Sequence, residues 1–229
     1  MAKITVFLSA GHGGSDPGAC ANGLKEKTIN LNTLKACRDE LERYCLNVVC
    51  SREKDEDDPV VQEVKEANKS GADLAVSFHA NAGGGDGFEA FHHTSNSNMK
   101  KLAKLAEKHI KNLGQNSRGI KSGNHLYFIK HTTMPAVLFE SFFVDNKTDK
   151  KIGDTTAEQK KFGVAYAKAI LEYLGINYEV EPEKESEQAN KTSDVKYRVQ
   201  VGAYSKKANA EAMQEKLKAA GFDAVIVKA

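Results

Sequence analysis

Hydrophobic and polar positions alternate with two different periods along the first 175 residues, and each period predicts one kind of element. Short apolar runs, typical of buried strands, cover residues 3–9, 46–50, 73–78, 87–91, 126–129 and 136–139. Apolar residues that recur every three or four positions predict helices over residues 27–44, 59–71, 99–113 and 155–174. Strands and helices in this alternation predict an α/β fold, an open twisted sheet of mostly parallel strands with helices on both faces.

Several helix ends carry local signals. Asp58 precedes Pro59, which predicts an N-cap followed by proline at the first helical position. Thr155 and Glu158 form the pattern of a capping box, and Gly175 is placed to end the helix that follows it.

The pattern changes after residue 178. Residues 179–194, "EVEPEKESEQANKTSD", are polar, charged and without apolar periodicity, which predicts a flexible linker. Residues 195–229 then predict a strand, an amphipathic helix with Met213 and Leu217 on its apolar side, and a second strand. The sequence therefore predicts a first domain over 1–178, a linker over 179–194 and a small βαβ unit over 195–229.

Charge and composition limit the classes of binding partner that the chain can have. The 33 Lys and Arg against 31 Asp and Glu give a formal net charge of +2, too weak a field to favour nucleic acid. No segment is long and apolar enough for membrane insertion. The chain enters its first strand without the pattern of a signal peptide, so we expect synthesis in the cytoplasm.

The four cysteines, Cys20, Cys37, Cys45 and Cys50, include no CxxC pair. Three of them fall on patterns that predict helix or buried strand. We therefore expect reduced thiols in the core of a protein that folds in a reducing compartment.

One histidine, His12, lies in the glycine-rich stretch "FLSAGHGGSDPGAC" directly after the first predicted strand. Such a loop can be a phosphate cradle, part of a metal site or a plain turn. No Lys-Ser or Lys-Thr follows the glycines and no helix begins at once, which disfavours phosphate. His79, in "SFHANA", also follows a strand, and the carboxyl ends of parallel strands meet at one edge of a sheet. Two histidines at one edge favour a metal.

Glu26 is the candidate for a third ligand. Taken alone, it is a first-turn acid that the helix dipole favours. Together, His12, Glu26 and His79 make a His₂Glu set with an open fourth position, the arrangement of a catalytic zinc. A zinc ion lowers the pKa of its water and polarises a carbonyl. The sequence therefore predicts a Zn²⁺ site.

Glu140 ends the apolar run of "MPAVLFES" and is the candidate general base. A carboxylate at the end of a buried strand costs free energy unless it has a partner or a function. Desolvation raises the pKa of such a group, which suits proton transfer. These residues alone predict a zinc-dependent amide or ester hydrolase. The remaining histidines are expected to be solvent-facing or hydrogen-bonded, with His131 the first candidate for an exception.

The first domain resembles the zinc-dependent N-acetylmuramoyl-L-alanine amidases of bacterial and phage cell-wall lysis. The resemblance covers residues 3–175 and rests on "AGHGGSDPGA", "GLKEKTINL", "SREKD", "SFHANA" and "MPAVLFESFFVDN", which occur in the family's order. It implies that His12, Glu26 and His79 bind zinc and that Glu140 is catalytic. It also implies the substrate, the amide between the lactyl group of N-acetylmuramic acid and L-alanine in peptidoglycan.

The chain departs from the family after the glutamate. The family usually has Glu-x-Gly-Phe-x-Ser-Asn, whereas this chain has Phe142 in place of the small residue and Asp145 in place of the serine. Because the glutamate is kept, the departure bears on pocket shape and wall preference rather than on activity.

The tail, "YRVQVGAYSKKANAEAMQEKLKAAGFDAVIVKA", resembles the first half of the sporulation-related repeat, which binds peptidoglycan. The whole repeat is βαββαβ, so this chain carries half of it. A unit of this size buries too little core alone, so we expect two tails to pair and form a homodimer. The alternative is a remnant or a truncated chain.

The sequence is compatible with three function classes. The favoured one is an amidase, and the others are a non-catalytic peptidoglycan-binding module and a different zinc hydrolase such as a peptidase. The favoured setting is a phage endolysin that reaches the wall by holin-dependent release. The alternative is a sporulation autolysin that acts during mother-cell lysis.

Overall fold

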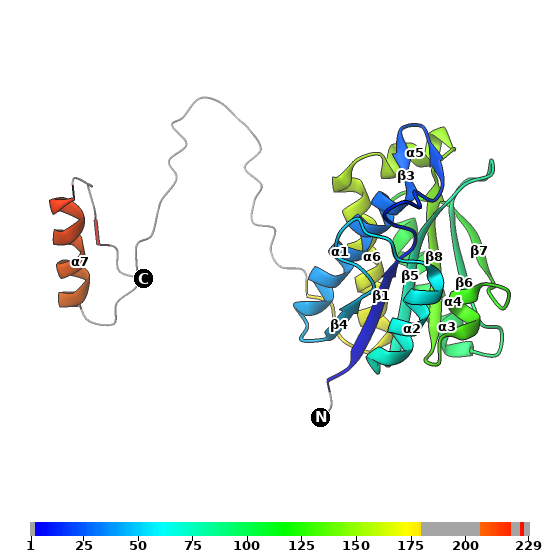
Figure 1. Cartoon of the computed structure of the whole chain (residues 1–229), viewed down its shortest axis with the longest axis horizontal. Helices are drawn as coiled ribbons and strands as arrows, with labels where there is room; N and C mark the ends of the chain where they lie inside the picture. The colour runs from blue at the N-terminus through cyan, green and yellow to red at the C-terminus, as the bar shows by residue number, and fades with distance from the viewer. Residues whose placement is uncertain (1–2, 180–206, 221–224, 227–229) are drawn as a thin grey trace. The chain divides into compact units, whose positions relative to one another are not determined.

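The computed structural model describes residues 3–179, 207–220 and 225–226. It divides into two compact units, Met1–Val180 and Glu181–Ala229 (Figure 1). The predicted linker, apart from Glu179, lies outside the described residues.

The first unit is built on a sheet of six strands in the order β4-β1-β5-β8-β6-β7 (Figure 1). The strands are β1 Thr5–Ala10, β4 Asn47–Cys50, β5 Leu74–Asn81, β6 Phe88–His92, β7 Ser117–Ser122 and β8 Ala136–Phe143. Strands β4, β1, β5 and β8 are parallel, and β6 runs antiparallel to β8. A separate two-stranded sheet joins β2 Cys20–Ala21 to β3 Leu24–Lys25. The prediction of an open, mostly parallel sheet is confirmed.

Helices cover both faces of the six-stranded sheet, as predicted. One face carries α1 Glu26–Glu42, α3 Ser97–Lys111 and α6 Thr156–Tyr173, which share a large apolar core with the strands. The other face carries α2 Val60–Ser70 and α4 Tyr127–His131 over a smaller apolar cluster. A further helix, α5 Lys147–Gly153, contacts α6 and β8.

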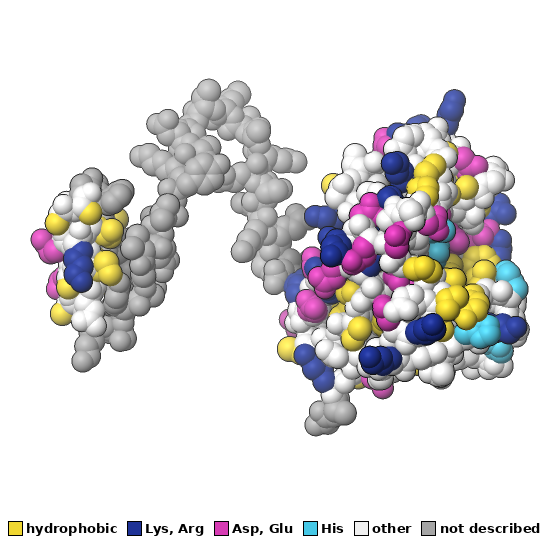
Figure 2. Space-filling model, viewed as in Figure 1, with side chains coloured by type: hydrophobic (Ala, Val, Ile, Leu, Met, Phe, Trp, Pro, Cys, Tyr) yellow, Lys and Arg dark blue, Asp and Glu magenta, His cyan; other side chains and the backbone are white. Residues whose placement is uncertain are grey.

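The smaller layer is also the more exposed one. Val60 and Val61 on α2 and Tyr127 on α4 are exposed hydrophobic residues. Figure 2, in the view of Figure 1, shows hydrophobic side chains beside histidines over this part of the first unit.

Three local predictions were wrong. The apolar run at residues 126–129 belongs to helix α4, because an apolar run of four residues does not distinguish a strand from a helix turn. The strand at the sheet edge is instead β7, "SRGIKS", whose few apolar residues gave no strand pattern. At α2 the N-cap position is Pro59, with an extended ψ of 142°, and no side chain caps the helix. Asp58 lies one residue earlier.

The four cysteines are free, but they are not all in the core. Cys37 is buried and Cys50 is half-buried, whereas Cys20 and Cys45 are exposed. The prediction of core thiols is therefore right for Cys37 and wrong for Cys20 and Cys45, since Cys20 lies in the exposed short strand β2 and Cys45 lies in the surface turn after α1.

In the second unit, the structure describes helix α7, Lys207–Ala219, which confirms the predicted helix. Its half-buried residues are Ala210, Met213, Gln214 and Leu217, the side that the apolar pattern predicted. The strands predicted on either side lie outside the described residues, except for residues 225–226, which are not in a strand. Across the described parts of both units, none of the helices has the length and apolar character needed to cross a membrane.

Candidate active site and metal centre

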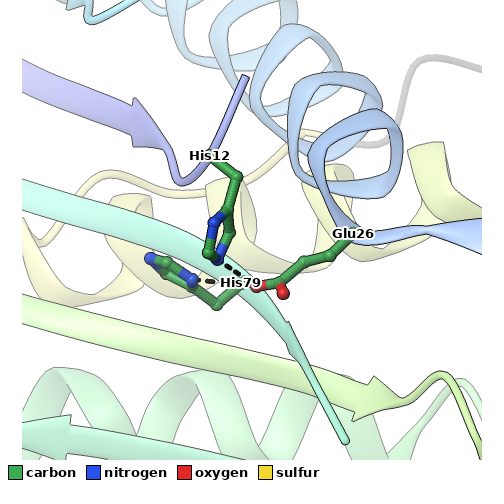
Figure 3. Close-up of side chains that lie close together, drawn as sticks. All are labelled: His12, Glu26 and His79. Carbon is green, nitrogen blue, oxygen red and sulfur yellow. Dashed lines mark hydrogen bonds and ion pairs between the residues drawn. The ribbon is translucent and has the colours of Figure 1, made fainter. Parts of the chain in front are cut away.

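Three of the predicted site residues converge at one edge of the sheet. His12 follows β1, His79 lies near the end of β5, and Glu26 is the first residue of α1. Each offers a ligand atom, and these three atoms all lie within 4.8 Å of one another (Figure 3). His79 Nδ1 lies 2.9 Å and His12 Nε2 3.3 Å from the same carboxylate oxygen, Oε1 of Glu26. The donors suit a divalent metal.

Glycines make this convergence sterically feasible. A Cβ on Gly11 would lie 2.1 Å from Cε1 of His79, and a Cβ on Gly18 would lie 2.7 Å from Oε2 of Glu26. Gly18 also has a φ of 63°, in the left-handed region that glycine adopts at little cost. The low side-chain bulk of the loop therefore has a structural reason: larger residues would displace the ligands.

Glu26 is held as an anion. Its Oε2 accepts a hydrogen bond from the backbone N–H of Ala19 at 2.8 Å, and its Oε1 accepts one from Ala80 at 3.1 Å. Burial by itself would raise the pKa of Glu26, but the hydrogen bonds with His12 and His79 outweigh it and hold the pKa well below its usual range. The ionised carboxylate is the form that ligates a metal.

Asp16 orients His12 from the other side of the ring. Its Oδ2 lies 2.8 Å from Nδ1 of His12, and its Oδ1 accepts a hydrogen bond from the N–H of Gly18 at 2.9 Å. The hydrogen bond to Glu26, helped by Asp16 and opposed by burial, raises the pKa of His12 to about 9. The metal-free site therefore holds a proton on His12 that a metal would displace.

Glu140 stands beside the cluster and is not one of the three residues that form it. It pairs in register with His79 across β8 and β5, so the two side chains share one face of the sheet. Its Oε2 is buried and has no hydrogen-bond partner among the described residues. Burial raises the pKa of Glu140 to about 7, reinforced by Glu26 and opposed by His79. A carboxyl group in this state is suited to proton transfer at neutral pH.

Residues of the "SREKD" stretch support the glycine loop, a role that sequence reasoning missed. Arg52 is buried and donates hydrogen bonds to the carbonyl oxygens of Ala10 and Lys27, at 2.9 and 2.8 Å. Asp55 accepts from the N–H of Gly14 at 2.8 Å. In the sequence, these residues form only a pattern of a basic residue followed by acidic ones after a strand. Such a pattern does not predict which groups they bind.

The two residues that depart from the family pattern lie in different surroundings. Phe142 is fully buried, with its ring 5.5 Å from that of Phe162 in the large core. Asp145 accepts hydrogen bonds from the N–H groups of Gly83 and Gly84, at 2.9 and 2.8 Å. Phe142 therefore belongs to the core, and Asp145 shapes the glycine loop that follows β5.

The other histidines lie outside the cluster. His131, the candidate exception, is exposed at the end of α4, with its ring 4.2 Å from that of Tyr127. His109 lies 2.8 Å from Glu172, and Nδ1 of His92 lies 2.7 Å from the carbonyl oxygen of His93. These contacts confirm that they are hydrogen-bonded or surface residues.

The fold and the site together define an α/β protein with a His-Glu-His cluster that could hold a metal ion. The family model described as N-acetylmuramoyl-L-alanine amidase matches residues 6–172, and the chain belongs to this family. Its members hydrolyse peptidoglycan, as the resemblance implied. A second model, the SPOR domain, matches residues 167–229 and thus begins earlier than the predicted unit at 195.

Individual relatives agree with the family. The chain is 32% identical to the N-acetylmuramoyl-L-alanine amidase CwlM of Bacillus licheniformis over 228 residues, 98% of this chain and 85% of that one. It is 37% identical to the endolysin of Bacillus phage SPP1 over 185 residues, 77% of this chain and 68% of that one. The catalytic domain of CwlV, an N-acetylmuramoyl-L-alanine amidase from Bacillus (Paenibacillus) polymyxa var. colistinus, superposes with a TM-score of 0.70 at 32% identity. That match covers 76% of this chain and 99% of the other.

Proposed function

We propose that the chain hydrolyses the amide between the lactyl group of N-acetylmuramic acid and L-alanine in peptidoglycan, with zinc at His12, Glu26 and His79 and Glu140 as general base. The observation that carries this proposal is the convergence of the three ligand atoms next to a buried carboxyl oxygen without a hydrogen-bond partner among the described residues.

The residues present fit zinc. Two imidazole nitrogens and one carboxylate oxygen are the donors of many catalytic zinc sites, which keep a fourth position for water or substrate. The carboxylate is ionised and the glycine loop leaves room around it. When bound, zinc supplies Lewis acidity that polarises the substrate carbonyl and makes water a better nucleophile.

Protein groups carry the proton transfers. Glu140 takes the proton of the attacking water and gives it to the nitrogen of the leaving amine. A pKa of about 7 allows both steps near neutral pH, because neither form of the carboxyl group is strongly favoured. Asp16 keeps the ring of His12 in the orientation that points Nε2 at Glu26.

We further propose that the tail binds peptidoglycan and that two tails pair to make a homodimer. The SPOR match over residues 167–229 supports wall binding, and the half-buried stripe of α7 offers an apolar surface. Light scattering on the full chain and on a chain that ends at Tyr178 tests the pairing. A dimer is expected only with the tail, and a monomeric full chain at tens of micromolar would overturn it.

The setting is proposed from the same relatives. A phage endolysin and a sporulation-specific amidase of Bacillus subtilis both align with the chain, in keeping with action after holin-dependent release or mother-cell lysis. Expression in a bacterial host should leave culture turbidity unchanged until the inner membrane is permeabilised. Lysis without permeabilisation would contradict this route.

Wall digestion tests the activity itself. Purified peptidoglycan treated with the chain should gain N-terminal alanine amines without new reducing sugar ends, and a chelator should abolish the gain. New amines on other residues would indicate a peptidase. Wall binding without any new amine would indicate a non-catalytic binding module.

A further inference from the structure

A β-bulge in β7 brings two cations to the row of charged residues that contains Glu140. Glu89 on β6 pairs in register with Glu140 on β8 and with Gly119 on β7. The β6–β7 register shifts just before Glu89, which leaves Arg118 as the extra residue, and Gly119 has a φ of 89°. In a regular strand, Arg118 and Lys121 would face opposite sides of the sheet. The bulge allows both to reach the same face.

Both cations bind one buried carboxylate oxygen. Nε of Arg118 and Nζ of Lys121 each donate to Oε1 of Glu89, and Nδ2 of Asn81 donates to Oε2 at 3.1 Å. Glu89 is 4% exposed, whereas the side chains of Arg118 and Lys121 are 42% and 38% exposed. Two positive charges thus face one negative charge, and the cations keep donors on the solvent side.

The strand order fixes where these cations lie relative to the reacting groups. The order β5-β8-β6-β7 places His79, Glu140, Glu89 and then the cations in sequence across the sheet. Neighbouring strands are about 4.8 Å apart, so β7 lies about 10 Å from β8. An extended peptide advances about 3.5 Å per residue, so this distance corresponds to two or three residues.

The direction follows from the proposed reaction. The carbonyl to be attacked belongs at the His12, Glu26 and His79 cluster, and the leaving amine belongs at Glu140, which protonates it. The peptide attached to that amine then extends away from the cluster, along the row toward β6 and β7. This direction of the peptide rests on the proposed function.

We propose that Arg118 and Lys121 form a subsite for a carboxylate of the stem peptide, two or three residues beyond the scissile amide. Hydrogen bonds between charged partners are stronger than neutral ones, and the guanidinium fork matches a carboxylate. Glu89 neutralises one of the two cations and fixes both in place. The remaining positive charge offsets the repulsion that Glu140 would otherwise exert on an anionic substrate.

Two matched substrates test the subsite. One is a muramoyl peptide with free carboxylates, and the other has the same length with those carboxylates as primary amides. We expect kcat/KM for the carboxylate form to be about tenfold higher. The double variant Arg118→Gln, Lys121→Gln should lose this preference through a higher KM, with kcat little changed. Lys101→Gln, an exposed residue on α3, makes a charge change elsewhere and should keep it.

Binding of the free peptides separates this inference from the proposed function. Calorimetry should show that the wild-type chain binds the carboxylate peptide more tightly than the amide peptide. This result is expected whether or not the chain cleaves the scissile amide. The single variant Lys121→Gln keeps the contact between Arg118 and Glu89, so it replaces the double variant if the latter does not fold. It should lower the preference for the carboxylate peptide about threefold. Equal affinity of the wild-type chain for both peptides would overturn the subsite, as would a folded double variant that keeps the preference.

Discussion

Phe139 and Glu140 are neighbours in β8, yet they serve opposite faces of the sheet. Phe139 is fully buried on the face of α1, α3 and α6, with its ring 4.6 Å from that of Tyr166. Glu140 faces the other side, in register with His79. Phe78 and His79 repeat the same division in β5. One face of these strands packs in the apolar core, and the other face bears the candidate site residues near the strand ends.

The difference between the faces indicates which substitutions change stability and which change activity. On the packing face, free energy comes from apolar burial and close contact, so removal of a side chain leaves a cavity. At the site, the ionised carboxylate of Glu26 and the carboxyl group of Glu140, whose Oε2 has no hydrogen-bond partner among the described residues, are kept although apolar residues would pack better.

The largest effect is expected for His79→Ala, because it removes one of the three proposed zinc ligands. The variant should lose bound zinc and wall lysis together, whereas the wild-type chain should purify with about one zinc per chain. Elemental analysis and turbidity measure the two losses. His131→Ala is the matched control and should keep both. Full zinc in His79→Ala would remove this residue from the ligand set.

Phe139→Ala should mainly lower stability. Truncation of a fully buried aromatic residue costs about 3–5 kcal/mol of the free energy of unfolding. Urea denaturation of the metal-free chain measures this loss. Phe91, which is only half-buried on the opposite face, should lose less when changed to alanine. An equal loss at both positions would contradict the contrast between the two faces.

A smaller effect is expected from Asp58, a buried acid on the loop before α2. Burial raises its pKa to about 7, reinforced by Glu63 and opposed by a hydrogen bond from Ser51. An unfolded aspartate has a pKa of about 4, so the folded chain binds the extra proton between about pH 4 and 7. The contribution of Asp58 to the free energy of unfolding should therefore fall as the pH rises through this window.

Asp58→Asn removes this proton uptake. The variant should gain stability relative to the wild-type chain as the pH rises from 5 to 7.5, as measured by urea denaturation at each pH. Parallel pH curves for the two chains would show that Asp58 titrates normally.

The smallest effect is a difference in reactivity among the four cysteine thiols, without any change in stability. Burial raises the pKa of Cys37, and it raises that of Cys50 to about 12, so both thiols should react slowly in the folded chain. Cys20 and Cys45 are exposed and should react first. Titration without reductant should find two fast thiols in the native state and about four in denaturant. Fewer than four in denaturant would indicate disulfides.

Much of the site could be predicted from the sequence because parallel strands end at one edge of a sheet. That rule brings His12, His79 and Glu140 together from strand patterns alone. Arg118 was missed because its direction depends on a bulge, and β7 has no apolar alternation. Asp16 and Arg52 were missed because their hydrogen-bond partners depend on the conformation of the loops. Short runs such as residues 126–129 carry too few positions to define a period.

The most direct test of whether Glu140 is the general base and not a zinc ligand is the variant Glu140→Gln. Bound zinc and amide hydrolysis are measured in the same preparation. Glu140 lies beside the three proposed ligands without being one of them, so the variant should keep about one zinc per chain and a wild-type melting temperature. Its rate of N-terminal alanine release from peptidoglycan should fall by about a hundredfold or more, because the proton acceptor is gone. Hydrolysis at the wild-type rate, or loss of the zinc, would contradict the account.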